Sequence, residues 1–197
     1  MVGFMTSNLT ELDKILLEIL GRVIVEDSPE KWKNAKFLNQ RKISIDKRGS
    51  VGERFFAETL LKLYPRRIEY NDGDQGDWDL KINKIKFEIK TSTLDKSNKF
   101  QNEGLKKDGD YDGILFLGIA PNDLYIKFIK KSDIDFDNLV VKSNTGITHL
   151  HNRGKDEKKE KATGAGYKCD FKISEMKEIK TLDDIKNEFE RVFITTN

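Results

Sequence analysis

Apolar residues recur every three to four positions near both ends of the chain, a pattern that predicts amphipathic helices. Residues 9–20 align leucine and isoleucine side chains in one stripe, and a second such stripe begins at about Thr181. A third helix is predicted over residues 50–64, because Ser50 and Glu53 have the spacing of a capping box and a proline follows the segment. The inward positions of the closing helix are Leu182, Ile185, Phe189 and Val192.

The middle of the chain carries shorter apolar runs that predict strands. Residues 111–121 form a strongly apolar strand, and residues 123–130 are its expected partner across a Pro-Asn turn. Residues 146–150 and 167–173 predict two further strands, whereas the polar stretch 97–107 is expected to be a short helix or loop. Helices, then strands, then a closing helix indicate an α/β (α+β) fold, with a mixed central sheet flanked by helices.

A β-hairpin is predicted over residues 77–90, with Asn83-Lys84 as its two-residue turn. This register pairs Leu80 with Phe87 and sets Asp79 opposite Glu88, because side chains alternate between the faces of a strand. Leu80, Ile82, Ile85, Phe87 and Ile89 then share the core face, and Asp77, Asp79, Glu88 and Lys90 share the other.

The opposed acids of this hairpin suggest a metal site. Directly opposed side chains on neighbouring strands have Cβ atoms roughly 5 Å apart, and like charges at that range destabilise a sheet. A divalent cation held by Asp79 and Glu88 would remove the repulsion. Lys90 lies two residues beyond Glu88 on the same face, where it could orient a water molecule or stabilise developing negative charge. The alternative is a solvated charged face, which Lys81 and Lys86 would suit.

Composition limits the classes of protein that fit. The chain has 197 residues, enough for a single domain, with 37% hydrophobic and 36% charged residues. Its net charge of +2 excludes a simple polybasic nucleic-acid binder, so any such affinity has to come from local clusters. The single cysteine, Cys169, excludes an internal disulfide and favours a reducing compartment. No signal peptide or membrane span is predicted, and we expect a cytoplasmic protein.

Two basic segments are candidates for DNA contact. In residues 31–48, lysines and arginines are interleaved with Trp32 and Phe37, and a second set of basic residues lies in residues 151–168. Such side chains neutralise phosphates, and asparagine and arginine also read base edges. A solvated charged surface is the alternative for both segments. The candidate DNA-binding residues are Lys31, Lys33, Arg41, Lys42, Arg48, Asn152, Arg153 and Lys155.

The ordered acids and lysine resemble a known signature. "DWDL" followed by "FEIK" gives Asp-x8-Glu-x-Lys, which resembles the PD-(D/E)xK motif of restriction-endonuclease-like nucleases, although the proline is absent. Both Asp77 and Asp79 could be the first acid, and the hairpin register favours Asp79. Upstream, Gly49, Gly52 and Glu53 are similar to the Gly-x-x-Gly-Glu context in which many members present a further glutamate. The capping box remains the alternative role for Glu53.

The resemblance implies phosphodiester hydrolysis with one or two Mg²⁺ ions. Asp79, Glu88, Glu53 and the backbone carbonyl of Ile89 would bind metal, and Lys90 would position or activate the attacking water. The catalytic residues would therefore be Asp79, Glu88, Lys90 and Glu53. By the same resemblance, the substrate is double-stranded DNA, and the enzyme is a small type II restriction endonuclease or the cleavage subunit of a heteromeric type IIS enzyme.

A chain of this size has little room for a separate recognition domain. We therefore expect a homodimer or a complex with a specificity or partner nuclease subunit. Within one nuclease domain, residues 1–48 would be a helical, basic part, residues 49–130 the catalytic core, and residues 131–197 the C-terminal strands, basic loop and closing helix. The alternatives are a structure-specific nuclease, acting on junctions or in repair, and a nuclease-fold DNA-binding subunit without catalysis.

Overall fold

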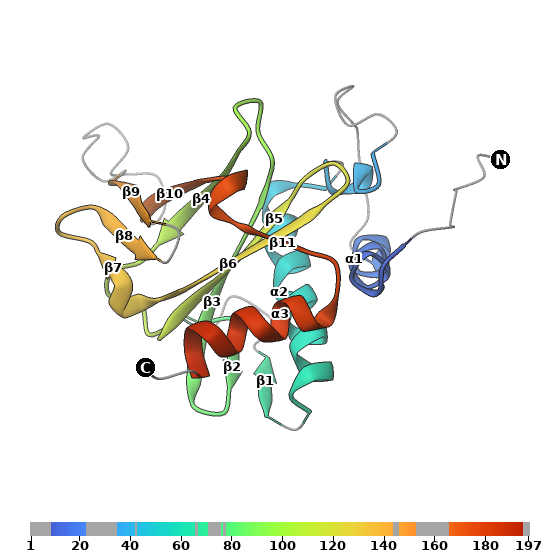
Figure 1. Ribbon diagram of the computed structural model, residues 1–197, viewed down its shortest axis with the longest axis horizontal. Coiled ribbons are helices and arrows are strands. Elements are labelled where there is room, and N and C mark those ends of the chain that lie inside the picture. The colour runs from blue at the N-terminus through green and yellow to red at the C-terminus, as the bar shows by residue number, and fades with distance from the viewer. Residues whose placement is uncertain are drawn as a thin grey trace.

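The described strands form two sheets that lie against each other. The structure is a computed structural model that describes residues 9–22, 35–41, 43–65, 67–70, 76, 78–143, 146–152 and 166–194. The larger sheet has six strands in the order β1-β2-β3-β5-β6-β11, and the smaller has five in the order β4-β10-β9-β8-β7. In Figure 1 the smaller sheet lies to the left, and the three helices lie to the right and below.

The six-stranded sheet is mixed, as predicted. Its strands are β1 (Ile68–Tyr70), β2 (Leu80–Ile82), β3 (Ile85–Thr93), β5 (Gly113–Ile119), β6 (Leu124–Lys130) and β11 (Lys177–Ile179). β3 and β5 run parallel, and the other neighbours are antiparallel. Every residue of β5 is buried, as expected for a central strand that is covered on both faces.

Both faces of this sheet carry a hydrophobic core. Leu115 and Leu117 of β5 point into the core that the helices cover, whereas Ile114 and Phe116 point into the core under the smaller sheet. The smaller sheet contains β4 (Lys99–Leu105), β7 (Ile134–Asp135), β8 (Val140–Ser143), β9 (Gly146–Asn152) and β10 (Tyr167–Lys172). The result is three layers, with helices, a mixed sheet and a second sheet, which confirms the predicted α+β class.

The helices follow the predicted stripes, with one boundary moved. The described helices are α1 (Glu11–Arg22), α2 (Ile45–Leu63) and α3 (Leu182–Phe189), and short 3-10 turns occupy Leu38–Arg41, Lys131–Asp133 and Ile173–Glu175. The prediction that the third helix starts at Ser50 was wrong: α2 starts at Ile45, so Ser50 lies inside it and is no cap. α3 begins after Thr181, close to the predicted start; Thr181 caps it, and the chain continues as a π-helix over Glu190–Ile194. No helix in the described ranges is long and apolar enough to span a bilayer.

The secondary-structure prediction for residues 97–107 was wrong. This stretch was expected to be a short helix or loop, but it forms β4, which pairs with β10 rather than with a neighbour in sequence. Its buried residues are Phe100, Asn102 and Leu105, and the step of three between the last two breaks the alternation that signals a strand. β4 therefore leads from β3 to the parallel strand β5 as part of the second sheet.

Candidate active site

The predicted hairpin forms in the predicted register. Leu80 pairs with Phe87 and Ile82 with Ile85, across a turn in which Asn83 has a positive φ of 58°. That conformation is the one a tight two-residue hairpin turn requires, and asparagine tolerates it well. Leu80, Ile82, Phe87 and Ile89 are buried in the core beneath the helices. The polar positions of the hairpin consequently lie on the opposite face.

Asp79, Glu88 and Lys90 come together on that opposite face. Asp79 is held at the start of β2, where its backbone N–H donates to Phe87 O at 2.9 Å. Its carboxylate Oδ2 accepts the backbone N–H of Ile89 at 2.6 Å, so the side chain reaches across to β3. The ammonium of Lys90 contacts Glu88 Oε1 directly as an ion pair. The two side chains of that pair are only 13% (Glu88) and 21% (Lys90) exposed.

This environment disfavours the charge on Asp79. Burial raises the pKa of Asp79 from 3.8, and the neighbouring Glu88 carboxylate raises it further, to about 6. The hydrogen bond from Ile89 and the positive charges of Lys90 and Lys106 act in the opposite direction. Two close carboxylates beside a lysine, with one pKa displaced by burial, are typical of sites that bind cations or move protons.

Glu53 lies in α2, which packs on the helix-side core. It is half-buried in α2, and a methyl group at Gly49 would lie 3.5 Å from Glu53 Oε1. Among the residues that the structure describes, no three histidine, cysteine or acidic side chains group closely enough to hold a metal ion. The described acidic site is therefore a pair of carboxylates, and Asp77, the alternative first acid, lies outside the described residues.

Most of the candidate DNA-binding residues lie outside the described part of the chain. These are Lys31, Lys33, Lys42, Arg153 and Lys155, and for Arg41 and Asn152 only the backbone is described. Arg48 is half-buried in the first turns of α2. Phe37, expected among basic residues at the DNA, is fully buried in the helix-side core, so its role is packing.

The prediction of the site from the sequence did not include two residues that lie beside it. Gly104 of β4 lies next to Lys90, and the charge of Lys106 lowers the pKa of Asp79. Both belong to the stretch that was expected to be a helix or loop. The only available signal was a glycine within an otherwise strand-compatible segment, which often marks a bulge or a close approach of two backbones.

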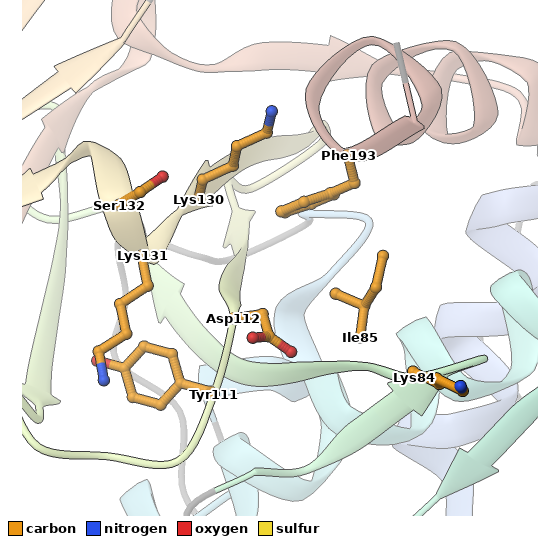
Figure 2. A pocket seen from close by; sticks show the side chains of 8 residues that line it. All are labelled: Lys84, Ile85, Tyr111, Asp112, Lys130, Lys131, Ser132 and Phe193. Atoms are coloured by element: carbon orange, nitrogen blue, oxygen red, sulfur yellow. The ribbon is translucent and has the colours of Figure 1, made fainter. Parts of the chain in front are cut away.

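A separate pocket of about 710 Å³ lies at the other end of β3, where the hairpin turns. Figure 2 shows Lys131 pointing to Tyr111, while Lys130 and Lys84 point away from both. The ammonium of Lys131 donates to Gly109 O at 2.5 Å, and Asp112 accepts a backbone N–H at 2.8 Å. The polar groups of this pocket therefore hold its own walls together and do not converge on a ligand. The remaining lining residues are Ile85, Ser132 and Phe193.

Comparison with known proteins gives little information about function. No protein-family model matches the chain, and no curated protein matches it. One solved structure to which it is similar is described as "Restriction endonuclease in complex with substrate DNA", with a TM-score of 0.43 and 14% sequence identity over 82% of this chain and 84% of that one. A similarity this low carries no inference about activity, so the function has to be argued from the site.

Proposed function

We propose that the protein is a Mg²⁺-dependent DNA endonuclease of the restriction type. The observation that carries the proposal is the meeting of Asp79, Glu88 and Lys90 on one face of the hairpin. Two of these residues are acids that repel each other, and the third is a lysine that is largely shielded from solvent. The same three residues, in the same order, give the chain its resemblance to the PD-(D/E)xK nucleases.

The residues fit a magnesium ion. Mg²⁺ is usually held in proteins by one or two carboxylates, with water and substrate phosphate completing its shell. Asp79 and Glu88 provide the carboxylates, and the backbone carbonyl of Ile89 and the carboxylate of Glu53 are the further candidate ligands. A bound ion would supply Lewis-acid polarisation of the scissile phosphate. The raised pKa of Asp79 means that this acid is ready to bind a cation above about pH 6.

Each side chain then has a definite task in hydrolysis. Asp79, fixed by the Ile89 N–H, and Glu88 would hold the cation, whose charge would offset their repulsion. Lys90 orients the attacking water and places its positive charge beside the phosphate oxygens. The water oxygen would give up a proton as it adds to phosphorus, one P–O ester bond would break, and the leaving oxygen would take up a proton from solvent, so that no net proton is gained or lost at the site. Glu53, on the neighbouring helix, would act through a water molecule or a second ion.

The substrate of this proposal is double-stranded DNA. One such site cuts one strand, so cleavage of both strands needs a second copy of the chain or a partner nuclease subunit. Lys31, Lys33, Arg41, Lys42, Arg48, Asn152, Arg153 and Lys155 remain the predicted contacts to phosphates and bases. Neutralisation of phosphates by such residues predicts binding that weakens steeply with salt.

The test is digestion of a supercoiled plasmid of known sequence, with Mg²⁺ and with EDTA, followed by mapping of the ends. We expect discrete fragments with Mg²⁺, or site-specific nicks if a partner subunit cuts the other strand, and intact plasmid with EDTA. Cleavage confined to branched DNA would contradict the restriction assignment and support a structure-specific nuclease. Binding of DNA with no cleavage under any metal would support the non-catalytic subunit.

A further inference from the structure

Strand β4 crosses beside the active site with a break in its pairing. Glu103 and Gly104 of β4 stand opposite the single residue Lys168 of β10, so β4 carries a β-bulge at this point. Gly104 adopts a φ of +76°, a conformation that side-chain-bearing residues rarely take. The bulge brings the backbone of β4 to the ammonium of Lys90.

The backbone conformation favours glycine at position 104, and the close approach of a neighbouring backbone requires it at position 166. A methyl group at Gly104 would lie 3.7 Å from Lys90 Nζ. A methyl group at Gly166, the residue before β10, would lie 2.7 Å from the Cα of Gly104. Two backbones without side chains therefore meet next to the ammonium, and a side chain on Gly104 would lie against it.

The ammonium of Lys90 carries three N–H groups. Within the described part of the chain, its hydrogen bond is to Glu88 Oε1, which uses one of them. In the proposed hydrolysis the others have to reach the attacking water or a phosphate oxygen. The space in which a side chain of residue 104 would lie is adjacent to these donors.

We propose that Gly104 is a positioning residue of the active site: its lack of a side chain keeps one side of the Lys90 ammonium open to water and to the phosphate. This inference rests on the proposed nuclease function. A methyl at this place would lie in ordinary van der Waals contact with Lys90 Nζ and would cover part of the ammonium, and a longer side chain would cover more of it. The residue acts through Lys90 and does not itself contact the reacting atoms.

If Gly104 served only the backbone conformation, its alanine and asparagine variants would lose cleavage activity in the opposite order. Asparagine tolerates positive φ better than alanine does, so Gly104→Asn should fold more stably than Gly104→Ala. Asparagine is also larger, so it should block Lys90 more completely. Backbone strain therefore predicts that alanine is the worse variant for cleavage, whereas access to Lys90 predicts that asparagine is the worse one.

The experiment measures kcat and KM for plasmid cleavage, and urea unfolding, in both variants. Gly146→Ala is the matched control, because Gly146 also has a positive φ of +115° but no atom within 4 Å of its added methyl. We expect kcat to fall roughly tenfold in Gly104→Ala and roughly a hundredfold in Gly104→Asn, with KM nearly unchanged. The control should keep the kcat of the wild type.

A second readout does not depend on cleavage. The rate of acetylation of Lys90 by acetic anhydride, measured by mass spectrometry in metal-free protein, should fall severalfold in Gly104→Ala, further in Gly104→Asn, and not in Gly146→Ala. If the wild type cleaves no DNA, the proposed function fails, while this order of labelling would still show that Gly104 keeps the Lys90 ammonium accessible. Equal labelling in all proteins, a larger kcat defect for alanine than for asparagine, or failure of both Gly104 variants to fold would overturn it.

Discussion

Replacing Asp79 with asparagine should make the protein more stable at neutral pH while removing the proposed nuclease activity. The carboxylate lies where its charge is disfavoured, since burial and then Glu88 raise its pKa from 3.8 to about 6. Asparagine keeps a side-chain oxygen that can accept the Ile89 N–H, and it carries no charge. The substitution therefore removes the charge and keeps the geometry of the hairpin.

The size and sign of the effect follow from proton binding. The folded protein holds the Asp79 proton to a higher pH than the unfolded chain does, so the stability that this proton provides is complete below pH 3.8 and is lost as the pH rises through about 6. At about 1.4 kcal/mol per pKa unit, the loss reaches about 3 kcal/mol by neutral pH. Because Asp79 is only half-buried, this figure is an upper bound.

The assay is urea unfolding at several pH values between about 4 and about 8, followed by tryptophan fluorescence. Trp78, the neighbour of Asp79, packs against the core under the smaller sheet and should report the transition. The stability of Asp79→Asn relative to the wild type should be near its minimum at the acid end and should rise by up to about 3 kcal/mol at the other. A difference that stays constant with pH would refute the displaced pKa.

A second variant, Glu88→Gln, tests what raises the pKa of Asp79. Burial is the larger cause and the charge of Glu88 the smaller one. Removing that charge should therefore lower the pKa of Asp79 but leave it above 3.8, as measured by carbon NMR of the aspartate carboxyl. A return to 3.8 would show that repulsion, and not burial, dominates at this position.

Three further predictions concern the cation, the packing of α2 and the cysteine. Mg²⁺ should raise the melting temperature of the wild type at about pH 8 and not that of Asp79→Asn; equal shifts would sink the metal assignment. Gly52→Ala should lower the free energy of unfolding by about 1–3 kcal/mol, because its methyl would lie 1.7 Å from Thr91 Oγ1. Its matched control on the same helix, Gly49→Ala, should raise that free energy by up to about 1 kcal/mol, and the reverse order would contradict the packing. Cys169 is buried, which raises its pKa to about 12, so iodoacetamide should modify it only after unfolding; rapid labelling of the folded protein would contradict this burial.

The hairpin that carries Asp79, Glu88 and Lys90 could be predicted because the pattern that specifies it is local. A two-residue turn and strict alternation fix the register, and a shift by one residue would expose every apolar side chain. Asp79, Glu88 and Lys90 consequently share a face in the structure as the sequence predicts. The helical stripes at both ends are local in the same way, and α1 and α3 form where they were expected.

The features that could not be predicted from the sequence depend on contacts between residues far apart in the chain. β4 is stabilised by β10, more than sixty residues later, and its bulge hides the alternation that would identify it. The start of α2 was misplaced because Ser50 and Glu53 have the spacing of a capping box although they lie inside the helix. Gly52 is what lets α2 approach Thr91 of β3, a contact that no local pattern shows. The proximity of Gly104 to Lys90 follows from these long-range contacts, so no local pattern could have shown it.

The rate of plasmid cleavage by the wild type and by Lys90→Ala, measured side by side with Mg²⁺ and with EDTA, tests the central claim most directly. Wild-type protein should cut the plasmid only with Mg²⁺. Lys90→Ala should bind DNA with nearly unchanged affinity and lose at least about a hundredfold in cleavage rate. Full activity in Lys90→Ala, or equal cleavage with EDTA, would contradict the assignment of Asp79, Glu88 and Lys90 as a hydrolytic site.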